Sequence, residues 1–573
     1  MKKGERYIGK VVRVDFPNRG LIEIIDKCDF DGNRLNLDSA QIKEDVSDYS
    51  VIVKNVVLDS TILFYIQKKR NGRAEGIYLS CLDYGAYTKE DKSQICPHFG
   101  SCGGCVYQNM DYKKQLEMKE GQIKKLLDEA VDKDSPYQFE GLIESPYEAY
   151  YRNKMEFTFG DSYKDGPLVL GLHKKNSMYD IVDIVGCKIC HPDFSLIVDF
   201  VQEYMRSRNF SFYHKVRHEG FLRHLLVRRA VKTKEILICL VTTSAEEGLD
   251  YNDLAAKLKE LKLEGQIAGF MHITNDSLAD AVKNEKSELI FGRDFIKEEI
   301  LGLEFKISAF SFFQTNSLGA ERLYEKAREY ASMDQTHCLF DLYSGTGTIG
   351  QMMASSVDQV IGVEIVEEAV AAANENAKLN GLDNCSFIAS DVLLAIDNIG
   401  QKPDMIILDP PREGINPKAL DKILNFNVDK MVYISCKASS LAFDLIAIQK
   451  AGYRVVKAAA VDMFPGTANV ETVALLSKLS ESPKIGVTLN VEKLPISPAE
   501  TKATYEKIKY YVENKYGFKV TNLYIAQVKQ EYGIIERENY NKGEGKNRVP
   551  QCPDKKREAI IDALQYFQMI SKA

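Results

Sequence analysis

Two acidic residues and one cysteine stand beside apolar segments in the C-terminal half of the chain. Asp409 follows the segment 405–408, Cys436 follows 431–434, and Glu471 comes directly before another apolar run. Side chains at the carboxyl ends of neighbouring parallel strands meet in one crevice. A thiol and a carboxylate brought together in this way suit covalent catalysis with proton removal.

The stretch from residue 338 onward must position these side chains, and in it strand patterns alternate with helix patterns. This alternation predicts a doubly wound parallel sheet. The strand at 339–343 is followed by Gly-Thr-Gly-Thr-Ile-Gly at 345–350, a dinucleotide-type fingerprint that is weak evidence by itself. The next two strands lead to Glu364 and Asp391, which suit ribose hydroxyls and an adenine amino group respectively.

Two kinds of cofactor fit these glycines. A nicotinamide or flavin nucleotide would explain them, but it gives no role to Asp-Pro-Pro-Arg at 409–412. Prolines directly after a strand stiffen the crevice and carry no N–H donor, which suits a pocket for a flat base. S-adenosylmethionine explains more, because backbone amides can hold its amino acid end while Glu364 and Asp391 bind the nucleoside. Upstream, Gln314 is a further donor to cofactor or base.

Three cysteines, Cys96, Cys102 and Cys105, lie close together in a glycine-containing stretch. The glycines let the backbone wrap closely around whatever the sulfurs hold. A fourth ligand must come from elsewhere, and Cys187 and Cys190 are the candidates. Pairing Cys102 and Cys105 with Cys187 and Cys190 gives a zinc spacing, whereas Cys96, Cys102, Cys105 and Cys187 form an iron–sulfur set. Spacing alone leaves both interpretations open.

Composition points to a cytosolic protein of several domains. The chain has 573 residues, with 45% hydrophobic and 27% charged residues, as soluble globular proteins have. Its N-terminus lacks an apolar signal segment, and no apolar run has the length of a membrane span. Because the cytosol keeps thiols reduced, we expect the twelve cysteines to serve metal binding or catalysis rather than disulfides.

The N-terminal stretch, residues 1–88, contains short alternating apolar runs separated by turn residues. This pattern predicts a small antiparallel barrel. Such barrels often bind single-stranded nucleic acid, but a barrel that only packs against its neighbours explains the pattern equally well.

Two further segments suggest contact with RNA. Between residues 206 and 234 many cations are interleaved with aromatic residues and opposed by one acid; strand-like segments there would concentrate the charge on one sheet surface. Tyr-Arg-Asn-Lys at 151–154 combines an aromatic ring with donors and a cation, although a solvated strand edge is the commoner explanation. The formal net charge of −7 argues against a basic surface overall, but it allows a local site of this kind.

Taken together, the motifs resemble those of S-adenosylmethionine-dependent RNA uracil-5-methyltransferases. The particular match is the branch that acts on 23S ribosomal RNA and carries a TRAM barrel and a [4Fe-4S] cluster. The resemblance covers roughly residues 1–480 and is strongest after 310. The matching motifs are Cys96-x5-Cys102-Gly103-Gly104-Cys105 with Cys187, Phe313-Gln314-Thr315-Asn316, Asp341-Leu342-Tyr343-Ser344-Gly345, Asp409-Pro410-Pro411-Arg412, Ser435-Cys436 and Val470-Glu471-Thr472.

This resemblance implies a role for each matching residue. Cys436 would be the nucleophile and Glu471 the general base. The cofactor contacts would be Gln314, Tyr343, Thr348, Glu364, Asp391 and Asp409, and the cluster ligands would be Cys96, Cys102, Cys105 and Cys187. The chain departs from the family at Asn469, where histidine is usual, and at Lys437-Ala438, where Asn-Pro is usual.

The chemistry supports the same assignment. C5 of uracil is too weak a nucleophile to take a methyl group directly from a sulfonium. Attack of a thiolate at C6 makes the ring electron-rich at C5, and after methyl transfer a base must remove the C5 proton so that the thiolate can leave. The target base must also leave its stack, at about a few kcal/mol.

We therefore expect an α/β enzyme with three domains and an appendage. They are an OB-like, TRAM-like β-barrel at 1–88, a central α+β iron–sulfur and RNA-binding domain at 89–300, a Rossmann-like methyltransferase domain at 301–480, and an appendage without assigned role at 481–573, with helices at 498–516 and 554–567. The expected activity is 23S rRNA (uracil-5-)-methylation by a cytoplasmic monomer without a membrane partner. The alternatives are an iron–sulfur oxidoreductase that uses nicotinamide or flavin, and a non-catalytic RNA-binding protein.

Overall fold

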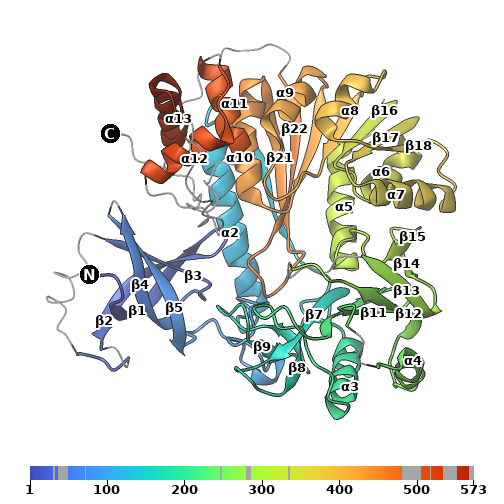
Figure 1. The fold of residues 1–573 in the computed structure, drawn as a ribbon. Helices are drawn as coiled ribbons and strands as arrows, with labels where there is room; N and C mark the ends of the chain where they lie inside the picture. The colour runs from blue at the N-terminus through green and yellow to red at the C-terminus, as the bar shows by residue number, and fades with distance from the viewer. Residues whose placement is uncertain are drawn as a thin grey trace, which may run out of the picture. The chain divides into compact units, whose positions relative to one another are not determined.

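The computed structural model describes residues 1–29, 32–36, 49–70, 72–245, 248–278, 285–332, 336–479, 505–516, 518–532 and 552–566. The chain divides into two units, Met1–Leu489 and Asn490–Ala573, and Figure 1 shows the helices and strands of each. Among the described residues, no helix is long and apolar enough to cross a membrane.

Five strands at the N-terminus form a closed barrel in the order β1-β2-β3-β5-β4. They are β1 (Arg6–Asp15), β2 (Arg19–Cys28), β3 (Ser50–Lys54), β4 (Thr61–Arg70) and β5 (Arg73–Asp83). Alternation along the strands sends Val11, Ile62 and Phe64 into the barrel, where each is fully buried. The predicted barrel is therefore present, but it is not wholly antiparallel, because β3 and β5 run parallel.

A seven-stranded sheet follows, in the order β13-β12-β11-β10-β7-β8-β9. Its strands are β7 (Lys154–Asp161), β8 (Leu168–His173), β9 (Ile181–Asp183), β10 (Leu222–Arg229), β11 (Glu235–Thr242), β12 (Gln266–Thr274) and β13 (Lys286–Gly292). Helices α3 (Pro192–Ser207) and α4 (Tyr251–Lys259) pack into the same apolar cluster as Phe157, Leu225 and Phe270.

The cations on β10 are buried, which contradicts the predicted basic sheet surface. Both faces of β10 are covered, because Leu226 packs into one apolar cluster and its neighbour Leu225 into another. Arg223, His224, Arg228 and Arg229 are each at most 6% exposed. RNA contact is therefore wrong for these four residues. Exposed cations remain on both sides of β10: Arg208, Arg217 and His218 before it, and Lys232 and Lys234 after it.

The third layer is an eight-stranded sheet in the order β18-β17-β16-β19-β20-β22-β21-β6. Its strands are β6 (Gln138–Ile143), β16 (Cys338–Leu342), β17 (Gln359–Glu364), β18 (Cys385–Ala389), β19 (Met405–Leu408), β20 (Lys430–Ser435), β21 (Tyr453–Val461) and β22 (Glu471–Lys478). The strands from β18 to β20 are parallel, as predicted. β22 runs antiparallel to both of its neighbours, so the sheet is mixed.

Helices cover both faces of this sheet, as Figure 1 shows. They are α5 (Ser317–Ala331), α6 (Thr348–Met353), α7 (Glu367–Leu379), α8 (Val392–Asn398), α9 (Pro417–Asn425) and α10 (Ala438–Lys450). Because successive strand residues face opposite sides, Val432 and Ile434 share an apolar cluster with Leu323 of α5. Tyr433 between them donates a hydrogen bond of 2.6 Å to Asp444 of α10. The hairpin of β14 (Phe295–Ile300) and β15 (Leu303–Ser308) precedes α5.

One segment predicted to belong to the central domain lies in the methyltransferase-type layer instead. β6 pairs in parallel with β21 at the edge of the eight-stranded sheet. Helix α2 (Tyr112–Ala130) precedes β6 and contacts α10, with Ile123 and Leu127 fully buried. Residues 112–143 thus pack with the eight-stranded sheet, and this arrangement brings α2 to the loop before Glu471.

The second unit is a small helical module. Its helices are α11 (Tyr505–Tyr516), α12 (Asn522–Glu531) and α13 (Asp554–Tyr566), and Ile508, Ile525 and Ile560 are among the residues of its core. Helices are found within both predicted ranges, although residues 498–504 and 567 lie outside the described residues.

Candidate active site

A cavity of about 1450 Å³ opens at the carboxyl ends of β16, β17, β19 and β20. Residues of the central sheet, among them Met271 and Ser287, line it as well. All eight residues predicted to bind the cofactor or to act in catalysis line this one cavity: Gln314, Tyr343, Thr348, Glu364, Asp391, Asp409, Cys436 and Glu471. The structure therefore brings them together, as expected of residues at neighbouring strand ends.

The turn after β16 is shaped by a glycine and by Glu364. Gly347 has φ +70°, and a Cβ there would lie 2.5 Å from the ring of Phe387, so a side chain would clash as well as strain the backbone. The two carboxylate oxygens of Glu364 accept hydrogen bonds from the amides of Gly345 and Val366, each 3.0 Å long. These bonds hold the turn after β16 against the end of β17.

The predicted adenine side of the cavity lies at the start of α8. Asp391 is the N-cap of this helix and accepts a hydrogen bond of 2.8 Å from the amide of Leu393; its side chain is exposed. Ile365, which is 63% exposed, also lines the cavity. Sequence reasoning missed Ile365, although an apolar residue directly after an acidic strand end was a usable signal.

Cys436 lies directly after β20, immediately before the first turn of α10. Burial raises the pKa of its thiol to about 11, and the nearby carboxylates Glu471 and Asp409 add to this effect. Arg412 acts in the opposite direction, because its guanidinium hydrogen bonds to the thiol and favours the thiolate. The cationic partner that a reactive cysteine needs is thus present, but without RNA the thiol keeps its proton.

Three carboxyl groups crowd the same region, and all have a raised pKa. Burial, with Asp409 adding to it, raises the pKa of Glu471 to about 8. Burial and Asp341 raise the pKa of Asp409 to about 7. Asp341 is fully buried, and its pKa also rises to about 7, although the amide of Gly350 donates to it at 2.9 Å. Such perturbed acids in a cleft are typical of functional sites.

Tyr324 on α5 is a cavity residue for which the sequence carried no motif. It is 5% exposed, and its side chain hydrogen bonds with Gln314. Burial raises the pKa of its hydroxyl well above the usual value, and Asp409 and Glu471 add to the shift. Tyr324 therefore stays a neutral donor beside the acids.

The cysteines of the 96–105 stretch gather with those of the 187–190 stretch. Cys187 hydrogen bonds with both Cys96 and Cys190, and burial together with Cys187 and Cys102 raises the pKa of Cys105. Among the described residues, however, no group of three or more His, Cys, Asp or Glu side chains is arranged to hold a metal ion. The structure thus places the predicted ligands near one another without supplying evidence for a cluster.

Two of the four side chains in the Tyr-Arg-Asn-Lys stretch at 151–154 are buried. Tyr151 is 4% exposed, and its hydroxyl donates to the carbonyl of Pro465 at 2.8 Å. Asn153 donates to the carbonyl of Gln314 at 3.0 Å. Neither of these side chains is available to RNA, so their predicted RNA contacts are wrong. Arg152 does line the cavity.

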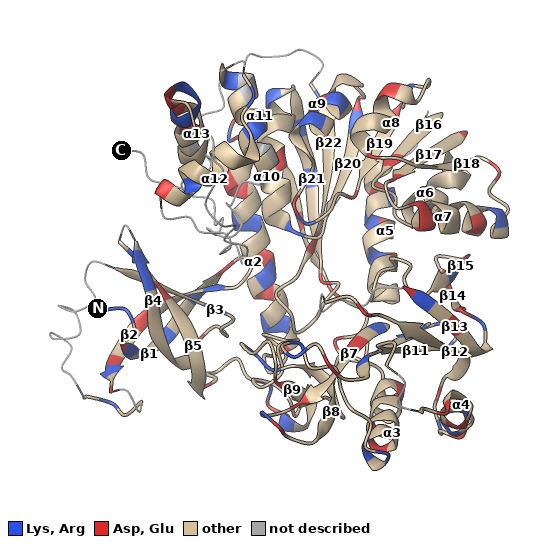
Figure 2. Ribbon diagram, in the orientation of Figure 1, with Lys and Arg blue, Asp and Glu red and all other residues tan. Residues whose placement is uncertain are grey.

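Charges elsewhere on the molecule are mixed in sign. Figure 2 shows Lys and Arg interspersed with Asp and Glu along the helices, as the formal net charge of −7 suggests.

Comparison with known proteins shows what the chain is related to. The model of the tRNA (uracil-5-)-methyltransferase family matches residues 111–479 and so ends before the second unit. An uncharacterised RNA methyltransferase of Clostridium acetobutylicum is 46% identical over 432 residues, which cover 75% of this chain and 93% of the relative. Another, from Caldanaerobacter subterraneus, is 46% identical over 426 residues, or 74% and 93% of the two chains.

The fold is also found in a solved structure. The crystal structure of Pyrococcus abyssi tRNA (uracil-54, C5)-methyltransferase in complex with S-adenosyl-L-homocysteine matches with a TM-score of 0.61 and 22% identity, covering 82% of this chain and 100% of that one. The family match spans more than half of the chain and the relatives agree with it. The chain therefore belongs to the tRNA (uracil-5-)-methyltransferase family, and it is an RNA (uracil-5-)-methyltransferase.

Proposed function

We propose that this enzyme methylates C5 of a uridine in 23S ribosomal RNA through a covalent bond between Cys436 and C6 of the base. The observation that carries the mechanism is the shared cavity, in which Cys436, Glu471 and the cofactor-side residues meet. The motifs that resemble the 23S ribosomal RNA branch support the choice of substrate.

In the first step the Cys436 thiol loses its proton to solvent, and the resulting thiolate attacks C6. Arg412, hydrogen bonded to the sulfur, stabilises this thiolate. The S–C6 bond forms, and the electron pair moves to an enolate with density at C5. C5 then takes the methyl group from the sulfonium, forming a C–CH₃ bond as the S–CH₃ bond breaks. S-adenosylhomocysteine is the product.

In the last step the Glu471 carboxylate removes the C5 proton, the C5–C6 double bond re-forms, and the Cys436 thiolate leaves. A positioned general base is worth about 10²–10⁴ in rate. Its pKa of about 8 makes Glu471 a stronger base than an ordinary carboxylate, and it places the proton transfer close to neutral pH.

The methyl donor fits the other side of the cavity. Glu364 would bind the ribose hydroxyls, Asp391 the adenine amino group, and Gln314, Tyr343, Thr348 and Asp409 the remaining groups. The glycine turn at 345–350 leaves backbone amides for the amino acid end.

We also propose that Cys96, Cys102, Cys105 and Cys187 hold a [4Fe-4S] cluster. Four neighbouring thiols are a suitable donor set, and the amide of Gly104 donates to Cys102 Sγ at 3.3 Å, as amides do to the sulfurs of such sites. Methyl transfer is redox-neutral, so a cluster would serve to tie the two cysteine stretches together. Iron and sulfide in an anaerobically purified brown protein would support this assignment; a colourless protein with zinc would refute it.

The closed barrel is proposed to be a TRAM domain that binds the RNA strand. The exposed cations before β10, among them Arg217, would hold the RNA phosphates.

The substrate is tested by presenting the enzyme with labelled S-adenosylmethionine and either 23S ribosomal RNA or tRNA, both lacking 5-methyluridine. We expect label in ribosomal RNA, and nuclease mapping then locates the uridine. The family description and the Pyrococcus abyssi neighbour both name tRNA. Label in tRNA alone would therefore overturn the choice of ribosomal RNA but leave the mechanism intact.

A further inference from the structure

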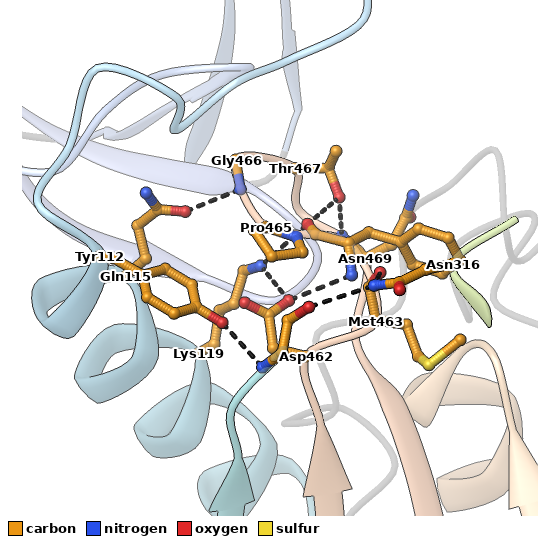
Figure 3. Close-up of polar contacts among 12 residues, drawn as sticks. Tyr112, Gln115, Lys119, Asn316, Asp462, Met463, Pro465, Gly466, Thr467 and Asn469 are labelled. Carbon is orange, nitrogen blue, oxygen red and sulfur yellow. Dashed lines mark hydrogen bonds and ion pairs between the residues drawn. The ribbon is translucent and has the colours of Figure 1, made fainter. Parts of the chain in front are cut away.

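The segment that joins β21 to β22, residues 462–470, delivers Glu471 to the cavity. Figure 3 shows this segment, held by side chains that come from outside its own hairpin. It is mostly buried: Asp462 and Met463 have no exposed surface, and Val470, next to Glu471, is 1% exposed. What fixes this segment also fixes where the carboxyl group of Glu471 lies.

The strongest of these contacts is a buried ion pair. Lys119 of α2 places its Nζ 2.8 Å from Oδ1 of Asp462, and both side chains have no exposed surface. The same ammonium donates to the carbonyl of Phe464 at 3.3 Å, and Asp462 Oδ1 accepts from the amide of Phe464 at 3.3 Å. Lys119 thus binds two residues near the start of the segment, Asp462 and Phe464.

Helix α2 and the stretch after Cys105 both bind the middle of the segment, at Gly466. Gln115, one turn before Lys119 on α2, accepts a hydrogen bond of 2.8 Å from the amide of Gly466. The carbonyl of Gly466 accepts from the amides of Val106 and Tyr107, at 2.9 and 2.8 Å. These two residues follow Cys105 directly, so the end of the cysteine stretch is tied to the segment that carries Glu471.

The remaining contacts come from the central layer and from α5. The hydroxyl of Tyr151 donates to the carbonyl of Pro465 at 2.8 Å. Asn316, the N-cap of α5, donates to the carbonyl of Met463 at 2.9 Å. Each of the consecutive residues from Asp462 to Gly466 is therefore bound by a residue from outside the segment.

An ion pair of this kind contributes little to stability. Taking two charges out of water costs several kcal/mol per ion, and well-packed apolar replacements are often as stable or more so. A charged pair does, however, have one favoured geometry, whereas apolar side chains of similar volume tolerate small shifts. Here that geometry sets the start of the segment that ends at Glu471.

We propose that Lys119 and Asp462 are positioning residues for the catalytic base. This inference rests on the proposed function, because it gives Glu471 the removal of the C5 proton. That step follows methyl transfer, so displacement of Glu471 slows release of the product and leaves attack by Cys436 and methyl transfer unaffected. Variants should therefore accumulate the covalent RNA adduct, which loss of folded protein would not produce.

The test measures the covalent adduct and its rate of breakdown. Lys119→Met enzyme is mixed with labelled RNA and S-adenosylmethionine, and the adduct is followed on denaturing gels in a single turnover. We expect breakdown to be slower by about 10²-fold, the effect of a misplacement of about 1 Å. Because kcat/KM depends only on the steps up to methyl transfer, kcat and the KM for RNA should fall together and their ratio should stay unchanged. Lys124→Met is the matched control: Lys124 lies on the same helix but is 53% exposed, and it pairs with Asp128. It should behave as the unsubstituted enzyme.

Lys119→Met leaves the carboxylate of Asp462 buried without its cation, which is destabilising. Two gentler variants therefore accompany it. Lys119→Met with Asp462→Asn removes both charges, and Tyr151→Phe removes one hydrogen bond to the segment. Both should accumulate adduct, Tyr151→Phe the less.

Glu471→Gln distinguishes a failure of the proposed base from a failure of the proposed positioning residues. If Glu471→Gln forms no lasting adduct, the proposed role of the base is wrong. If it does form one, but the folded Lys119 and Tyr151 variants break their adducts down at the unsubstituted rate, only the positioning role is overturned.

Discussion

The arginines of β10 and the acids at the ends of β16 and β19 are both buried charges, yet their surroundings differ. Arg223 donates to the carbonyls of Asn275 and Ser277, both at 2.7 Å, and Arg229 to Asp193 at 3.0 Å. Asp341 and Asp409 instead have raised pKa values. Burial is the main cause for both, and Asp341 adds to the shift of Asp409, which lines the cavity. Buried cations that donate to protein carbonyls and carboxylates hold a structure together, whereas a carboxyl group that lines a cavity is available for chemistry.

The largest effect should come from the thiol. Cys436→Ala removes the nucleophile, and activity should fall on the order of 10⁶-fold, as for other covalent enzymes that lose theirs. No RNA adduct should form, although binding of S-adenosylmethionine should persist. Methyl incorporation and equilibrium dialysis measure the two. Normal turnover by this variant would mean that the cavity works without covalent catalysis.

Glu471→Gln should lower turnover by about 10²–10⁴-fold and, unlike Cys436→Ala, should trap RNA on the protein. An amide cannot accept the C5 proton, so the reaction stops after methyl transfer. A gel shift that survives denaturation measures the trapped complex. Turnover without accumulation would show that another group is the base.

The cavity acids also predict how stability depends on pH. Burial raises the pKa of Asp409 from 3.8 to about 7 and that of Glu471 from 4.5 to about 8. A raised carboxyl pKa means that the folded state binds the proton more tightly. The stabilisation is therefore complete below about pH 4 and is lost as the pH rises to about 8.

Denaturant unfolding between pH 4 and pH 8 measures this dependence, and Glu471→Gln should flatten part of it. Turnover should change in the opposite direction, rising as Glu471 ionises. If the free energy of unfolding depended on pH equally in the variant and the unsubstituted protein, Glu471 would not contribute to this dependence.

Substitution of a buried arginine on β10 should affect stability, whereas substitution of an exposed arginine should affect RNA binding. Arg228 donates to the carbonyls of Ala309, at 3.1 Å, and Ser311. Arg228→Met leaves these buried acceptors without a donor and should lower the free energy of unfolding by about 1–3 kcal/mol. RNA binding by the folded protein should not weaken. If Arg228→Met instead lost RNA affinity at unchanged stability, Arg228 would contact RNA after all, as the sequence had predicted.

The smallest effect is expected from Arg217→Ala, the exposed counterpart. Its free energy of unfolding should change by less than about 0.5 kcal/mol. RNA affinity should fall, and the slope of log K against log salt should lose about 0.7 for one phosphate contact. Filter binding over a salt series measures the slope, and an unchanged slope would place the RNA elsewhere.

The same contrast explains what sequence could predict. That these residues share a cavity could be predicted because strand ends are local features: Asp409, Cys436 and Glu471 each border an apolar run, and sheet topology brings them together. The prediction of a cationic surface was wrong because Arg223 and Arg228 donate to carbonyls of residues far away in the sequence. Lys119 and Asp462 are 343 residues apart, and no local pattern pairs them. Tyr324 likewise lies in an ordinary helix, α5, and lines the cavity only because the fold brings that helix there.

The central claim is that Cys436 bonds to C6 of the uridine before the methyl group is transferred. RNA with 5-fluorouridine at the target tests it, because C5 then carries no proton for Glu471 to remove and the adduct persists. After digestion, mass spectrometry should find a methylated fluorouridine nucleotide on the peptide that contains Cys436. Its attachment to another cysteine, or methylated RNA with no protein adduct at all, would contradict the account.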